Sequence, residues 1–129
     1  MDTICENKPV DTAVELFGST YRYPFFAAPI GAMKMHYGDK YNDQEYNSIL
    51  VSACADDGIA AFTGDGVDSA VFSAAMDAIR AANGVGIPTV KPWNMELVYQ
   101  KLDAAKTSGC KAIAMDIDAA GLPFLKNMT

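Results

Sequence analysis

Short apolar runs alternate along the chain with longer segments in which apolar residues recur at helical spacing. The runs predict four strands, at residues 24–30, 59–62, 87–91 and 111–118. The periodic segments predict three helices, which begin at Asn42 or Asp43, near Asp68 and at Asn94, and which end before Gly58, Gly84 and Gly109. Strands and helices that alternate in this order form βαβ units, so the pattern predicts an α/β fold with a parallel sheet.

Each predicted helix carries one apolar stripe, which we expect to face the sheet. The stripes consist of Tyr46, Ile49, Leu50, Ala53 and Cys54 in the first helix, Val71, Phe72, Ala75, Ile79 and Ala82 in the second, and Met95, Val98, Leu102 and Ala105 in the third. On the last strand, Met115 and Ile117 are expected to face the helices. Asp116 and Asp118 point to the other face, because side chains alternate along a strand. Residues 31–38 are predicted to form a loop.

Glycines and polar side chains gather at the predicted carboxyl ends of the strands. These residues are Gly31, Thr63, Gly64, Asp65, Lys91, Trp93, Asp116 and Asp118. Loops at this edge hold the ligand in parallel α/β proteins, so we expect a binding site here. The opposite loops, residues 56–58 and 108–111, have ordinary turn compositions. Periodicity alone leaves open whether the strands form a small open sheet or one half of an eight-stranded barrel.

Composition limits the class of protein further. A chain of 129 residues, of which 50% are hydrophobic, predicts one globular domain. The net charge of −6 and the scattered basic residues argue against a nucleic-acid partner. No apolar run reaches the roughly 20 residues that span a bilayer, and the first residues do not resemble a signal peptide, so we expect a cytoplasmic protein. Cys5, Cys54 and Cys110 lack metal-ligand spacing, so we expect free thiols and no metal site.

Four segments at the strand ends form an ordered set, at residues 28–35, 62–65, 90–93 and 112–122. Together they resemble the FMN-dependent α-hydroxy-acid oxidase and dehydrogenase family, which includes glycolate and lactate oxidases, and the resemblance runs from Asp11 to Asn127. Members of this family fold as a (β/α)8 TIM barrel with FMN across its carboxyl-terminal mouth. The resemblance therefore implies half of such a barrel, with parallel strands one to four and intervening helices. Its single domain, residues 1–129, would comprise a lead-in 1–23, a core 24–118 and a tail 119–129.

The resemblance also implies FMN as the cofactor and assigns residues to its site. The expected cofactor-binding residues are Ala28, Pro29, Ile30, Gly31, Thr63, Gly64, Lys91 and Asp116. Residues 28–31 match the segment that lies against the isoalloxazine ring, where a glycine permits close backbone approach. Thr63, Lys91 and Trp93 stand where the family more often has serine, glutamine and tyrosine, and Trp93 is a candidate substrate contact. The residues by themselves also allow a turn aspartate at Asp65, a solvated Lys91 and a half-buried Trp93.

The catalytic groups of the family are only partly matched. Asp118 matches the carboxylate that orients the catalytic histidine, although it also suits a cap of the following loop. The family's histidine, its substrate-binding arginines and its phosphate-binding loops come from later strands. His36, the single histidine here, lies where the resemblance places no base, so we do not expect it to be catalytic.

The resemblance therefore implies an FMN-binding half-barrel that is inactive alone. It would oxidise a small 2-hydroxy acid once another chain or further sequence supplies the second half of the barrel, whereas a homodimer that closes a barrel would only repeat residues such as Lys91 and Asp116. One alternative is a non-catalytic, self-associating α/β module that binds flavin or a phosphorylated metabolite. Another is part of a different FMN barrel enzyme, such as type 2 isopentenyl diphosphate isomerase.

Overall fold

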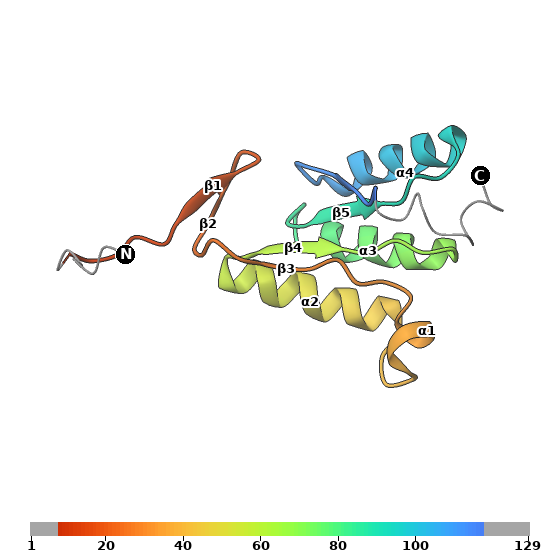
Figure 1. The fold of residues 1–129 in the computed structure, drawn as a ribbon, viewed down its shortest axis with the longest axis horizontal. Coiled ribbons are helices and arrows are strands. Elements are labelled where there is room, and N and C mark those ends of the chain that lie inside the picture. The colour runs from red at the N-terminus through yellow and green to blue at the C-terminus, as the bar shows by residue number, and fades with distance from the viewer. Residues whose placement is uncertain (1–7, 118–129) are drawn as a thin grey trace, which may run out of the picture.

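The computed structural model describes residues 8–117. Its elements are β1 (Val14–Leu16), β2 (Ser19–Tyr21), β3 (Phe26–Ala27), α1 (Met33–Tyr37), α2 (Asp43–Asp57), β4 (Ala60–Thr63), α3 (Ser69–Ala81), β5 (Ile87–Val90), α4 (Met95–Ser108) and β6 (Ala114–Met115). Strands β3 to β6 form one parallel sheet in chain order with helices between them, which confirms the predicted α/β fold (Figure 1). No helix within residues 8–117 is long and apolar enough to cross a membrane.

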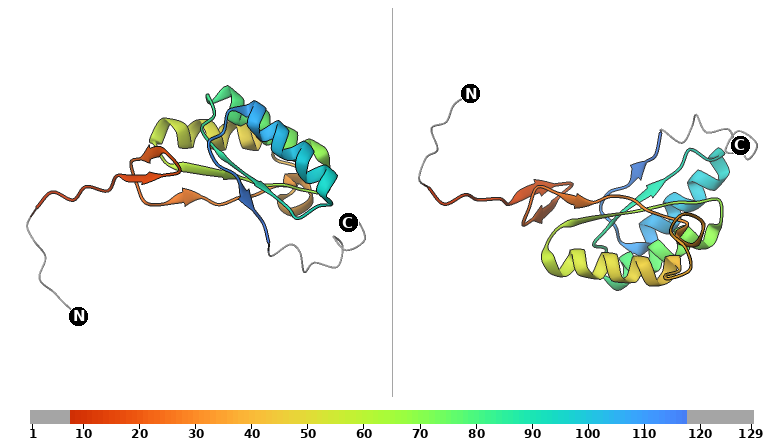
Figure 2. Two further views of the ribbon diagram at one scale, coloured as in Figure 1. Left: turned by 90° about the horizontal axis from the view of Figure 1, so that it is seen from above. Right: turned by 60° about the horizontal axis from the view of Figure 1, so that its bottom comes forward.

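Helices α2, α3 and α4 lie together on one face of the sheet (Figure 2). The hydrophobic core fills the space between these helices and the strands. Its buried members are Val51, Cys54, Ala61, Phe72, Ala75, Met76, Ala78, Ile79, Val90, Trp93, Val98 and Ala105. The predicted inward stripe of α3 is confirmed, because Val71, Phe72, Ala75 and Ile79 are all buried.

The inward face of α2 differs from the prediction. The buried residues of this helix are Asn47, Val51 and Cys54. Ile49 was expected to face inward but is 58% exposed, and Ala53 is exposed as well. Asn47 Nδ2 donates a hydrogen bond to the Asp43 carbonyl oxygen at 2.8 Å, which offsets part of the cost of its burial, while its buried Oδ1 has no partner among the described residues. Packing between α2 and its neighbours therefore selects a stripe that is rotated from the one counted along the sequence.

Helix α4 also differs in part. Val98 and Ala105 are buried as expected, but Met95 is 61% exposed. Lys101 lies between them on the buried stripe and is only 6% exposed. A lysine can take this position because its ammonium group forms an ion pair with Asp65 inside the protein.

Helix α1 occupies most of the segment that was predicted to be a loop. Met33 begins this helix and is buried. Its backbone N–H donates to the carboxylate of Asp43, at 3.2 and 3.3 Å from the two oxygens. The short helix is thus fastened to the first turn of α2, which a reading of local sequence does not reveal.

The N-terminal hairpin and the edge strands of the sheet also differ from the sequence prediction. No element was predicted within residues 1–23, yet β1 and β2 form an antiparallel hairpin there. Phe17 and Gly18 close the hairpin with φ values of 52° and 72°, the left-handed conformations that tight hairpin turns require. Strands β3 and β6 are shorter than predicted, because each pairs with only one neighbour in the described sheet. Met115 and Ile117 are 48% and 77% exposed, since no helix within residues 8–117 covers them.

We predict that Asn42→Ala lowers the free energy of unfolding by about 1 kcal/mol. Asn42 Oδ1 accepts a hydrogen bond from the Glu45 N–H at 2.8 Å, and Glu45 Oε2 accepts one from the Asn42 N–H at 3.0 Å. This capping box satisfies backbone donors at the start of α2. Urea unfolding measures the loss, with Gln44→Ala as a control at an exposed position of the same turn. Equal losses in the two variants would contradict the cap assignment.

Candidate functional site

A groove of about 880 Å³ lies at the carboxyl ends of the parallel strands. Its volume is within the roughly 300–1,000 Å³ typical of small-molecule sites. The groove brings together most of the residues that were expected to bind the cofactor. These residues are Pro29, Ile30, Gly31, Gly64, Lys91 and Asp116.

The other expected site residues lie elsewhere. Ala28 is exposed outside the groove lining, and Thr63 is completely buried beside the core. Trp93 is 6% exposed, so it is more deeply buried than the half-buried alternative assumed. Its indole Nε1 donates to Asp65 Oδ2 at 2.7 Å, which directs the polar edge of the ring into the protein. Asp118 lies outside the described residues.

The floor of the groove depends on two glycines. A Cβ atom at Gly64 would lie within 2.5 Å of the Ile30 carbonyl oxygen, and one at Gly31 would lie 2.9 Å from Val71 Cγ1. The loops after β3 and β4 therefore approach each other through bare backbone. A side chain at either glycine would therefore push these two loops apart.

An ion pair in the groove lining joins the ends of the neighbouring strands β5 and β6. Lys91 Nζ donates to Asp116 Oδ2 at 2.8 Å, and the two side chains are 19% and 33% exposed. The alternative of a solvated Lys91 is therefore wrong. The pair presents both a hydrogen-bond donor and an acceptor to a ligand in the groove.

The sequence analysis placed Asp65 at the expected binding edge, with a turn aspartate as the alternative, and did not single out Lys101. Asp65 Oδ1 accepts a hydrogen bond from Lys101 Nζ at 2.8 Å, and both side chains are buried. A signal for Lys101 was available, because it lies at helical spacing from Val98 and Ala105 on the inward stripe of α4. A charged residue on such a stripe indicates a buried partner.

Residues of α1 also line the groove, among them Met35, His36 and Tyr37. His36 is exposed, and its ring meets the ring of Tyr37 edge-on with centroids 6.2 Å apart. The prediction of a loop at residues 31–38 gave no reason to expect a helix wall here. Among residues 8–117, no group of three or more histidine, cysteine or acidic side chains is arranged to hold a metal ion.

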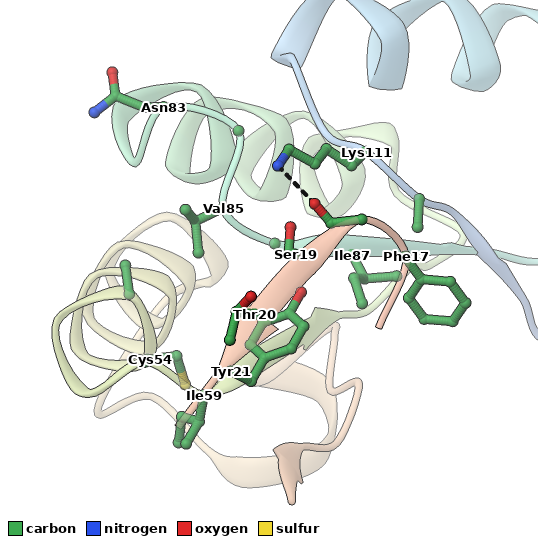
Figure 3. A pocket seen from close by; sticks show the side chains of 16 residues that line it. Phe17, Ser19, Thr20, Tyr21, Cys54, Ile59, Asn83, Val85, Ile87 and Lys111 are labelled. Atoms are coloured by element: carbon green, nitrogen blue, oxygen red, sulfur yellow. Dashed lines mark hydrogen bonds between the residues drawn. The ribbon is translucent and has the colours of Figure 1, made fainter. Parts of the chain in front are cut away.

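A second cavity, of about 390 Å³, lies at the amino-terminal ends of the strands (Figure 3). The hairpin forms one wall, and Lys111 Nζ joins it by donating to the Gly18 carbonyl oxygen at 3.2 Å. Cys54 also lines this cavity, and burial followed by the nearby Asp57 charge raises the pKa of its thiol. A raised pKa keeps the thiol protonated at neutral pH, so it is a poor nucleophile. None of the expected cofactor-binding residues lines this cavity.

A parallel β/α sheet with a ligand-sized groove at its carboxyl ends defines the class of α/β proteins that bind small molecules at this edge. The family model of the FMN-dependent dehydrogenases matches residues 1–125, and the chain belongs to this family. The family folds as a TIM barrel, with which the four-stranded parallel sheet is consistent as one half, and it binds FMN. The predicted family, fold class and cofactor are thereby confirmed. A search of curated proteins gives no match to the chain.

The groove residues fit a flavin ring. Pro29, Ile30, Gly31 and Gly64 line the groove beside the ends of β3 and β4 and offer backbone groups to a planar ligand. Thr89 lines the groove, and its buried Oγ1 has no hydrogen-bond partner among the described residues. The pyrimidine edge of a flavin carries carbonyl acceptors beside an N–H donor, which complements the donor of Lys91 and the acceptor of Asp116.

Proposed function

We propose that the groove binds the isoalloxazine ring of FMN and that the chain forms the flavin-holding part of a 2-hydroxy-acid oxidase or dehydrogenase. One observation carries the proposal. Of the eight residues expected to bind the cofactor, six line this single groove although they come from four different strand ends. Bound FMN supplies the hydride acceptor for oxidation of the hydroxy acid.

Different residues of the groove would contact different parts of the flavin ring. The backbone of residues 29–31 lies against one face, and the N–H groups of Ile30 and Gly31 are offered to the edge that becomes electron-rich on reduction. Lys91 donates to a carbonyl of the pyrimidine edge and places a positive charge beside it. Asp116 accepts from the neighbouring ring N–H and keeps the ammonium of Lys91 in place.

Catalysis needs further groups. We propose that residues 24–118 act as a half-barrel core and that a histidine base is supplied from outside it, by a second-half chain or further sequence. Asp118 would orient that histidine. His36 is the single histidine among the 129 residues. The chain alone is therefore proposed to bind FMN without oxidising 2-hydroxy acids, and loss of a general base typically lowers the rate by about 10²- to 10⁴-fold.

A self-associating module is a second candidate, and exposed apolar residues favour it. Phe26 on β3 is 58% exposed, and Ile117 beyond β6 is 77% exposed. These strands are the two edges of the described sheet, and unpaired edges promote pairing with another chain. Two copies would then close a barrel together. Light scattering at micromolar concentration tests this candidate, and a monomeric mass would exclude it.

We predict that Lys91→Met raises the Kd for FMN about 10- to 100-fold, because a hydrogen bond to a charged group contributes about 1.5–3 kcal/mol. Flavin fluorescence quenching and the shift of the visible absorption bands measure binding to the chain. Lys106→Met is the control, because Lys106 lies exposed on α4, away from the groove. Absence of saturable binding by the unaltered chain up to millimolar FMN would overturn the proposed function of this groove.

A further inference from the structure

The buried carboxylate of Asp65 links three parts of the fold beside the groove. Asp65 follows β4, and its side chain has no exposed surface. Its Oδ2 accepts hydrogen bonds from the backbone N–H of Lys91 at 3.0 Å and from Trp93 Nε1 at 2.7 Å. Its Oδ1 accepts from Lys101 Nζ and from the Gly66 N–H, both at 2.8 Å. Four donors thus occupy the roughly four acceptor sites of a carboxylate.

Fold stability alone does not account for this arrangement. Lys101 Nζ lies 4.3 Å from the ring centre of Phe72 and 5.8 Å from that of Trp93, so aromatic faces surround the cation. A buried ion pair nevertheless contributes little more stability than a well-packed apolar pair, because both charges lose their hydration. The Asp65–Lys101 pair is therefore better explained by the residues that the other hydrogen bonds of Asp65 hold in place.

The residue that it holds is Lys91. Asp65 fixes the backbone N–H of Lys91, and Asp116 binds the other end of the same side chain, at Nζ. The Trp93 N–H also donates to the Lys91 carbonyl oxygen at 2.8 Å, which closes the turn after β5. A lysine side chain has four flexible carbon–carbon bonds, so its ammonium group can move widely unless both the backbone and Nζ are held by hydrogen bonds. Fixing both ends restricts its ammonium group to one place in the groove.

We propose that Asp65 is a positioning residue for the flavin site. Its carboxylate, neutralised by Lys101, fixes the backbone of Lys91 and thereby fixes where the ammonium group meets the pyrimidine edge of the ring. The inference rests on the proposed function for the identity of the ligand. The fixing of Lys91 rests on the hydrogen bonds described above and can be measured without any ligand.

The test uses the 129-residue chain and the double variant Asp65→Ala/Lys101→Met, which removes the carboxylate without leaving a buried charge. The first readout is the NMR signal of the Lys91 Cε methylene, assigned with Lys91→Arg. Its two protons give separate resonances when the side chain is fixed and coincide when it is free. The second readout is hydrogen exchange of the Lys91 amide. The third is the Kd for FMN.

We expect the methylene resonances to coincide in the double variant, and both the exchange rate and the Kd to rise about tenfold. Val51→Ala is the control, because it weakens the core between helices without touching Asp65. Its Lys91 signals and Kd are expected to remain unchanged. Asp65→Leu/Lys101→Met, which keeps a side chain of similar shape at Asp65 without any acceptor, is measured in the same way if the first double variant does not fold.

Unchanged Lys91 signals in a folded Asp65 variant would overturn the inference. A Kd that rises equally in Val51→Ala would also overturn it, because the effect would then follow from lost stability. If the unaltered chain does not bind FMN while the Lys91 signals change in the double variant, the proposed function fails and the positioning of Lys91 stands.

Discussion

Asp65→Ala is expected to lower the free energy of unfolding by about 3–5 kcal/mol, because it leaves the buried ammonium of Lys101 without its partner. The substitution also removes the acceptor for the N–H groups of Gly66 and Lys91 and for Trp93 Nε1, so three further donors lose their hydrogen bonds. Domains of this size are stable by about 5–15 kcal/mol. The variant should therefore be close to unfolding at physiological temperature.

A double-mutant cycle separates the charge from the hydrogen bonds. Adding Lys101→Met removes the unpaired ammonium, so the double variant should recover part of the loss while the other three donors stay unpaired. Urea unfolding followed by far-ultraviolet circular dichroism measures each variant. Asp77→Ala is the matched control, because the Asp77 pair with Arg80 is 54% exposed on both sides and contributes about 0–1 kcal/mol. Equal losses at Asp65 and Asp77 would refute the buried ion pair as a major interaction.

The second large effect is expected for Gly64→Ala, which should destabilise the fold by about 1–3 kcal/mol or more. The added methyl group would meet the backbone of Ile30, at 2.5 Å from its carbonyl oxygen. A flexible side chain could move aside, but the Ile30 carbonyl cannot do so without displacing the backbone of the loop between β3 and α1. The carboxyl ends of β3 and β4 would then separate, and FMN binding should be lost together with the floor of the groove.

Gly66→Ala provides the control for this prediction. Gly66 lies two residues further along the same loop, and its added Cβ would meet Val71 Cγ2 at 3.1 Å. A methyl group at the end of a side chain can shift by a few tenths of an ångström, so we expect a much smaller loss of stability. The urea midpoint and the FMN titration are measured for both variants. Comparable results for the two glycines would show that the close approach at Gly64 does not limit the fold.

The order of strands and helices could be predicted because it depends on local signals. Asn94 caps α4 through its side chain, and Gly58 and Gly109 end helices with φ values of 70° and 83°. Such effects act within a few residues and are therefore visible in the sequence. The rotation of α2 was predicted wrongly, because two overlapping stripes fit helical spacing. Contact with the neighbouring elements chose the stripe that contains Asn47.

The edge of the sheet that forms the candidate site could also be predicted, because the carboxyl ends of parallel strands meet at one edge. The contacts within that edge could not. Asp65 and Lys101 are 36 positions apart, and the pair forms only when α4 packs beside the end of β4. The burial of Trp93 also depends on a contact between distant residues, because its indole N–H donates a hydrogen bond to the buried carboxylate of Asp65.

By itself, the sequence determined the α/β class, the succession of elements and the resemblance to an FMN-binding family, because turns, caps and motifs each depend on residues that are close together in the chain. The tertiary structure alone decided which side chains line the groove, which are buried and which charges pair. It placed Lys91 opposite Asp116 and enclosed Asp65 with Lys101. These pairings depend on the distances between elements far apart in the chain, and the close packing of the elements against one another sets those distances.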